Sequence, residues 1–153
     1  MSGHNYAGSI IVNLASLPDF LRKPILTKRM KEFFAMGPAE REEVIGNALE
    51  AGPTIPFPNF AKLLKTWLEI LASFPEDQRA LLFSGYVDQV RESPQKLIPF
   101  NLDGMLEVYL SLAENERGTI SATAGRILGG LDDESRRRVL LVIPARARDL
   151  FGL

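Results

Sequence analysis

Apolar residues recur at three- and four-residue spacing along most of the chain, which is the pattern of a helix with one buried face. No segment alternates apolar and polar residues for long enough to predict a strand. The pattern and its helix-start and helix-stop signals therefore predict an all-α fold, an array of about eight short helices. The predicted ranges are 7–16, 24–36, 39–51, 58–73, 76–92, 101–112, 115–129 and 133–150, with a kink or break at Pro144.

One short signature recurs: apolar residues, then a proline or small residue, an acidic residue and an arginine. Its two clearest copies begin at Trp67 and Met105, which are 38 residues apart. The arginine stands at positions 22, 41, 79, 117 and 136, so the spacings are 19, 38, 38 and 19. We therefore predict a single helical-repeat domain, residues 1–153, built from 19- or 38-residue helical-hairpin units with eroded copies near positions 60 and 98.

Each copy of the signature has the chemistry of a helix start. Pro18, Pro38 and Pro75 suit a first helical turn, where the missing N–H would have no partner in any case. An acidic side chain near this end also interacts favourably with the helix dipole. Four acidic residues lie three positions before the arginine and predict ion pairs of about 0.2–0.5 kcal/mol each. The pairs are Asp19/Arg22, Glu76/Arg79, Glu114/Arg117 and Asp133/Arg136.

Short helices at regular spacing cannot bury their apolar faces alone, so they stack on their neighbours. In helix length and in the Leu-Pro-acidic-x-x-Arg pattern, most of the chain resembles helical repeat domains of the HEAT and armadillo style. It also resembles the short-helix superhelices of flagellar switch proteins and of the cytosolic domains of magnesium transporters. The resemblance implies an open superhelix or a closed bundle, and it carries over no functional residue.

Two Ile-Pro-Phe segments, which begin at Ile55 and Ile98, each precede a predicted helix. Proline holds an extended connection at a low entropic cost. We expect these connections to aim Phe57 and Phe100 into the adjacent helical layer. The alternative is a loop at the rim of the fold that contacts a partner.

Composition and charge narrow the functional classes. The chain contains no cysteine, which excludes disulfides, thiolate nucleophiles and iron–sulfur ligation. Its formal net charge is −1, so no global field attracts nucleic acid or an anionic membrane. The beginning of the chain lacks the basic and apolar regions of a signal peptide, and no apolar run approaches the roughly 20 residues of a membrane span. We expect a cytoplasmic protein.

The residues that usually carry chemistry are sparse. His4 is the single histidine and lies near a terminus, where a disordered or surface position is expected. Gly125 and the Gly129-Gly130 pair match neither a Walker nor a Rossmann spacing, and the pair is typical of a helix C-terminus. We predict no catalytic residue, no cofactor and no metal site.

Charged side chains in equivalent positions of the units are the remaining candidates. A column of arginines and a ladder formed by Glu32, Glu69 and Glu107 could each bind a charged partner. We favour local ion pairs, inter-helix hydrogen bonds and a solvated surface for both sets. The arginines near the C-terminus could contact nucleic acid, but acidic neighbours and the lack of interleaved aromatic residues again favour a solvated face.

The sequence favours a non-catalytic protein–protein interaction or scaffold module, because stacked helices offer extended surfaces and no catalytic set is assembled. The candidate partner-binding residues are Arg79, Arg117, Glu69, Glu107, Arg137 and Arg138. One alternative is a small-molecule-binding protein or enzyme in which the first four of these converge in a concave pocket. A second is nucleic-acid binding through the C-terminal arginines. The partner is expected to be another protein, and a homo-oligomer is left open.

Overall fold

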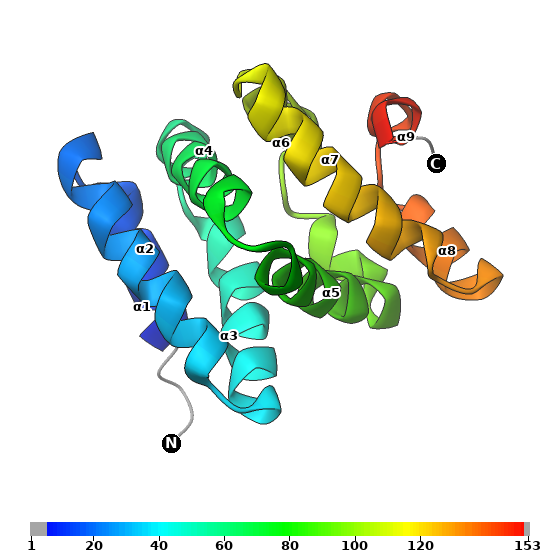
Figure 1. The fold of residues 1–153 in the computed structure, drawn as a ribbon, viewed down its shortest axis with the longest axis horizontal. Helices are drawn as coiled ribbons and strands as arrows, with labels where there is room; N and C mark the ends of the chain where they lie inside the picture. The colour runs from blue at the N-terminus through cyan, green and yellow to red at the C-terminus, as the bar shows by residue number, and fades with distance from the viewer. Residues whose placement is uncertain (1–5, 152–153) are drawn as a thin grey trace.

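The protein folds into an all-α array of stacked helices, seen in a computed structural model that describes residues 6–151 (Figure 1). Within this range there are nine α-helices, two short 3-10 helices and no strand, so the predicted all-α array is confirmed. His4 lies outside the described residues. The α-helices are α1 (Tyr6–Ala15), α2 (Asp19–Ala35), α3 (Pro38–Ala51), α4 (Phe57–Ser73), α5 (Glu76–Glu92), α6 (Leu102–Leu110), α7 (Glu114–Gly129), α8 (Asp133–Leu140) and α9 (Ala145–Phe151). The 3-10 helices are η1 (Gly52–Thr54) and η2 (Pro94–Leu97).

Two boundaries show how proline acts on this chain. The predicted break at Pro144 is confirmed, because this residue stands directly before α9 and separates it from α8. The predicted helix start at Pro24 is wrong: α2 begins at Asp19 and contains Pro24. In a regular helix the Phe20 carbonyl would accept the N–H that Pro24 lacks. Both residues are exposed, so solvent can bind the Phe20 carbonyl instead.

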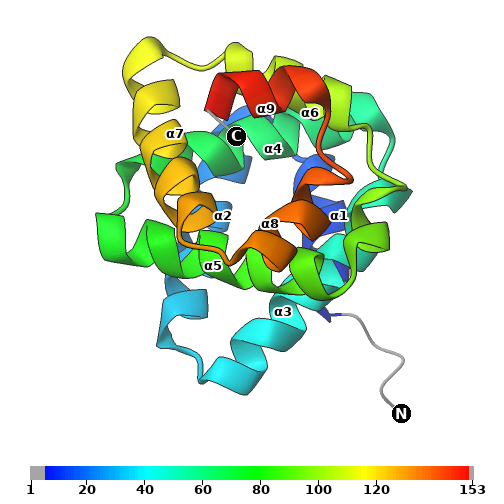
Figure 2. The ribbon, with the colours of Figure 1, turned by 90° about the vertical axis from the view of Figure 1, so that its right-hand side faces the viewer.

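The helices pack around a common axis rather than in flat layers. α1 packs on α3, α4 on α6 and α5 on α7, so the largest contacts join helices that are two apart along the chain. The helices follow one another along the long axis of the molecule, from α1 and α2 at one end to α8 and α9 at the other (Figure 1). Seen along this axis, α4, α5 and α7 lie around it (Figure 2).

Six helices begin in the same way, with an arginine as their fourth residue. These residues are Arg22, Arg41, Arg79, Arg117, Arg136 and Arg148. All but Arg136 donate a hydrogen bond to the backbone carbonyl five residues earlier, as in the 2.6 Å bonds of Arg41 to Met36 and of Arg79 to Phe74. Arg136 reaches the Gly129 carbonyl at 3.0 Å instead. The arginine column is thus a set of equivalent ties between helices, whereas a repeat of the whole unit stays a prediction.

Only part of the predicted ion pairing is present in the described residues. Asp19 and Glu76 bind the arginines three residues later, as predicted. The predicted pairs of Glu114 and Asp133 do not form. Arg117 instead donates to the carbonyls of Leu110 and Leu112, at 3.2 and 2.6 Å, and Arg136 donates to that of Gly129. A carbonyl at a helix end lacks an intrahelical donor, so it competes well for the guanidinium.

The two Ile-Pro-Phe segments pack on each other's glycines, and the predicted inward aim of both phenylalanines is confirmed. A Cβ at Gly52 would lie 2.7 Å from the ring of Phe100, and one at Gly104 would lie 2.5 Å from the ring of Phe57. Phe60 joins both rings, with centroid distances of 6.2 Å to Phe57 and 5.8 Å to Phe100. The absence of a side chain at each glycine therefore permits a close contact between the segments before α4 and α6.

We expect Gly52→Ala to lower the free energy of unfolding by about 1–3 kcal/mol, because the added methyl group overpacks the contact with Phe100. Gly118→Ala in α7 is the matched control, since nothing lies within 4 Å of a Cβ at that position. It should raise the free energy of unfolding by about 0.5–1 kcal/mol through the helix preference for alanine. Urea unfolding followed by circular dichroism measures both, and an unchanged Gly52→Ala protein would contradict the packing argument.

Candidate functional site

A large apolar cavity, half open to solvent, lies between the helices of the array. Its volume is about 570 Å³, and its wall includes residues of every α-helix from α1 to α9. The described core is divided into three clusters, which include Leu71, Leu68 and Val90 respectively. Half-buried side chains, among them Trp67 and Phe83, contact the first two clusters and line the cavity as well. These side chains therefore connect the core clusters to the cavity wall.

Aromatic rings form part of the cavity wall. Phe60 and Trp67 belong to α4, Phe83 belongs to α5, and Phe100 lies in the segment before α6. Two pairs of rings contact each other along the wall: Phe60 with Phe100 and Trp67 with Tyr86, whose centroids are both 5.8 Å apart.

Few polar groups line the cavity. Arg29 and Glu32 bind each other at 3.1 Å, and both side chains are about half exposed, so this pair stands where the cavity meets solvent. Tyr109 donates its hydroxyl to the Arg117 carbonyl at 3.0 Å. The fourth group is Tyr86, whose pKa is raised to about 12 because burial disfavours the charged phenolate. Apart from the indole N–H of Trp67, the wall is otherwise apolar.

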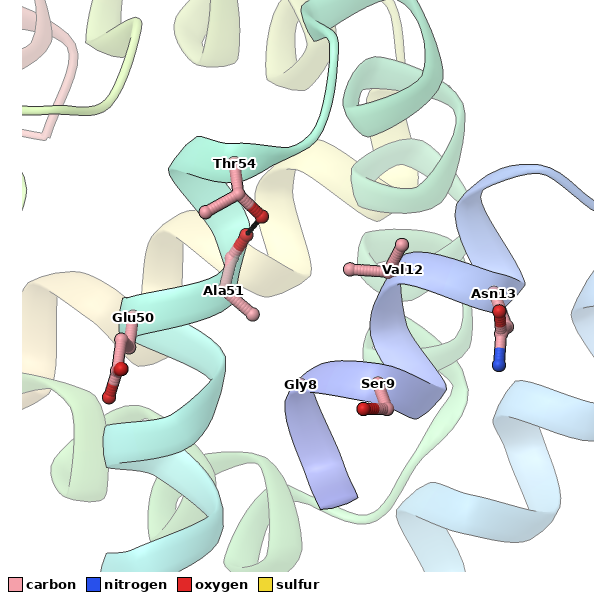
Figure 3. A pocket seen from close by; sticks show the side chains of 7 residues that line it. All are labelled: Gly8, Ser9, Val12, Asn13, Glu50, Ala51 and Thr54. Carbon is pink, nitrogen blue, oxygen red and sulfur yellow. Dashed lines mark hydrogen bonds between the residues drawn. The ribbon is translucent and has the colours of Figure 1, made fainter. Parts of the chain in front are cut away.

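A second hollow lies at the surface between α1 and the end of α3. Its volume is about 470 Å³, and it is lined by Gly8, Ser9, Val12, Asn13, Glu50, Ala51 and Thr54 (Figure 3). The Thr54 hydroxyl is used locally, because it donates to the Ala51 carbonyl at 2.6 Å. Glu50 and Asn13 stand at opposite ends of the hollow. These side chains do not converge on one point, so this surface forms no chemical site.

A buried polar cluster joins α5 to α7. Arg79 Nε donates to Thr123 Oγ1 at 2.8 Å, and the Thr123 hydroxyl donates to a Glu76 carboxylate oxygen at 2.9 Å. Arg126 also pairs with Glu76. The hydrogen bond from Thr123 is the largest cause that lowers the pKa of Glu76, and the two arginines lower it further against the effect of burial. Since every donor and acceptor is engaged, the cluster holds two helices together.

The structure places the sequence-predicted candidates away from the cavity, and none of the six lines its wall. The Arg79 guanidinium is buried in the α5–α7 cluster, and that of Arg117 binds backbone carbonyls. Glu107 is exposed and pairs with Arg146. The predicted convergence of these residues with Glu69 does not occur at the cavity.

The other two candidates lie on α8, where both are exposed. Arg138 donates to the Glu92 carbonyl at 3.3 Å, which links α8 to the end of α5. Of the predicted glutamate ladder, Glu32 alone stands at the cavity. The cavity residues were missed because an apolar side chain on a wall and one in a filled core give the same sequence pattern.

Two further properties belong to the described residues. No group of three or more histidine, cysteine, aspartate or glutamate residues that could hold a metal ion occurs in residues 6–151. Over the same part of the chain, no helix combines the length and the apolar character needed to cross a bilayer.

No protein-family model, no curated protein and no solved structure matches this chain. The helical array and its apolar cavity are therefore the features from which a function is inferred.

The Glu76 carboxylate makes a pH-dependent contribution to stability. Its pKa is lower when folded than when unfolded, so the contribution is fully present above the unfolded pKa of about 4.3 and is lost as the pH falls through the folded pKa. We expect Thr123→Val to lower the free energy of unfolding by about 1–3 kcal/mol at neutral pH, since Arg79 loses a buried acceptor. It should also flatten the acid dependence of stability.

Thr119→Val is the matched control one turn earlier on α7, because the Thr119 hydroxyl binds only the Asn115 carbonyl of its own helix. Thermal unfolding at a series of pH values from neutral to acidic measures both variants. Equal pH profiles for Thr123→Val and the wild type would contradict the role given to Thr123.

Proposed function

We propose that the protein is a non-catalytic binding protein that holds an apolar small molecule in the cavity between its helices. The observation that carries this proposal is the size of the cavity together with its apolar wall. The cavity is half open, so its apolar wall faces water when nothing is bound. An apolar occupant would remove this surface from water, which is favourable.

The volume is that of a small-molecule site. Pockets that bind drug-sized ligands and cofactors span about 300–1,000 Å³, and this cavity falls in that range. The wall also runs from α1 to α9, so an elongated, flexible molecule such as an acyl chain matches it best.

The arrangement of charges supports binding without chemistry. Arg29 and Glu32, the charged residues of the wall, are engaged with each other at the solvent edge. The α5–α7 cluster, with its lowered Glu76 pKa, is engaged in holding helices together. A role as carrier, store or sensor of an apolar compound fits these features.

We also propose that another protein distinguishes the loaded from the empty form. The exposure of two large apolar side chains, Phe20 at 75% and Leu141 at 76%, supports such a partner. A cytoplasmic location is proposed from the cysteine-free sequence, which suits a reducing compartment.

Binding can be followed through Trp67, which is the single tryptophan of the chain and lines the cavity. We expect linear methyl esters of increasing chain length to change its fluorescence in a saturable way. Each buried CH₂ contributes about 0.8 kcal/mol, so the affinity should rise about tenfold for every two added CH₂ groups and level off once the cavity is full. A wild-type protein that shows no saturable response at any chain length would contradict the proposal.

Ala124→Phe should occupy part of the cavity, because Ala124 of α7 belongs to its wall. We expect it to weaken ester binding at least tenfold and to raise the free energy of unfolding of the ligand-free protein by about 0.5–2 kcal/mol. Ala122→Phe is the matched control on the same helix, since Ala122 is exposed and lies outside the wall. If calorimetry showed an equal loss of ester binding in the two variants, the assignment of the site to this cavity would be wrong.

A further inference from the structure

Tyr86 brings a hydroxyl group to a wall that is otherwise almost entirely apolar. It lies in the C-terminal half of α5, where its ring meets Trp67 of α4 edge-on at an interplanar angle of 82°. The preceding residue is Gly85, and a side chain there would collide with Ile45 of α3. The close approach of α3 to α5 therefore fixes the part of α5 that carries Tyr86.

The Tyr86 hydroxyl has no hydrogen-bond partner among the described residues, in contrast to the Tyr109 hydroxyl on the same cavity. Tyr86 is half-buried, and burial raises its pKa to about 12. Its oxygen is not sealed among protein atoms, whereas Arg136 Nε is. Because Tyr86 lines the cavity, its hydroxyl is accessible to a molecule bound there.

The ring of Tyr86 alone would make the contact with Trp67, and phenylalanine would provide the same ring. The hydroxyl adds a hydrogen-bond donor that no group of the described chain uses. A bound molecule that excludes water from the wall would leave this donor unpaired, at a cost of about 1–3 kcal/mol, unless the molecule itself accepts the bond.

The charge of that ligand follows from the wall. A carboxylate taken into an apolar space needs a cation at close range. The cation of the wall is Arg29, which is half exposed and already bound to Glu32. A neutral oxygen, by contrast, needs only one donor.

We propose that the ligand is an uncharged, lipid-like molecule with a carbonyl or ether oxygen, and that the Tyr86 hydroxyl donates a hydrogen bond to this oxygen. The inference rests on the proposed function of the cavity and adds the chemical class of its ligand. Tyr86 is a specificity-determining residue in this scheme, because the apolar wall binds any chain of suitable size and Tyr86 selects those with an acceptor.

The test uses the full chain and two ligands of equal shape: a long-chain methyl ketone, and the alkene in which a CH₂ group replaces the carbonyl oxygen. Calorimetry should show that the wild type binds the ketone up to about tenfold more tightly than the alkene. Tyr86→Phe should bind both with equal affinity and leave alkene binding unchanged. Tyr109→Phe, which loses the bond to the Arg117 carbonyl, should keep the ketone preference. The free fatty acid of the same length should bind at least tenfold more weakly than the ketone at neutral pH.

Different negative results would overturn the proposed function of the cavity and the role of Tyr86. If the wild type binds neither ligand, the proposed function is wrong and the inference falls with it. If it binds both equally, or if the ketone preference survives in Tyr86→Phe, the role of Tyr86 is wrong while the cavity function stands. Tighter binding of the fatty acid than of the ketone would overturn the uncharged class alone. The wild-type comparison needs no variant, so it holds even if Tyr86→Phe folds poorly.

Discussion

The array depends on a hydrogen bond that runs from an arginine in the first turn of a helix back to a carbonyl at the end of the preceding element. Five helices make this bond across the same five-residue interval. A guanidinium is a rigid fork of donors, so the bond fixes the direction in which each helix leaves its predecessor. Arg22 and Arg79 are almost fully buried, which protects their bonds from competition by water. These arginine bonds set the angles between successive helices, so the fold does not depend on side-chain packing in the interior alone.

The local features of this fold could be predicted from the sequence, because their causes are local. Proline, an acidic residue and an arginine within one turn mark a helix start, and the arginines at 22, 41, 79, 117 and 136 all occupy the fourth position of a helix. Arg148 has the same position and was overlooked, since it follows Arg136 by 12 residues and falls outside the 19-residue spacing. Pro24 misled the prediction because its effect depends on whether the carbonyl of Phe20 faces solvent, which only the tertiary structure decides.

The candidate site was beyond the reach of the sequence for a different reason. Helical periodicity shows that Trp67, Phe83 and Ala124 face inward, but not whether another side chain meets them there. Equally, Thr123 gives no signal of its role, because its partners Glu76 and Arg79 are more than forty residues away in the sequence. The charged residues that the pattern did emphasise serve mainly to join helices. Spacing identifies which groups are equivalent, whereas the proposed site depends on the space that the packed helices leave between them.

One geometrical feature reaches beyond ligand choice. Stacked helical arrays contact only their neighbours and tend to unravel from their ends, as separate units. Here a single space borders both the first helix and the last. A molecule that spanned this space would touch helices at both ends of the array, and its binding free energy would be lost as soon as either end frayed. A bound ligand would thus make the helices unfold as one cooperative unit. The resistance of the protein to proteolysis would then show whether the ligand is bound.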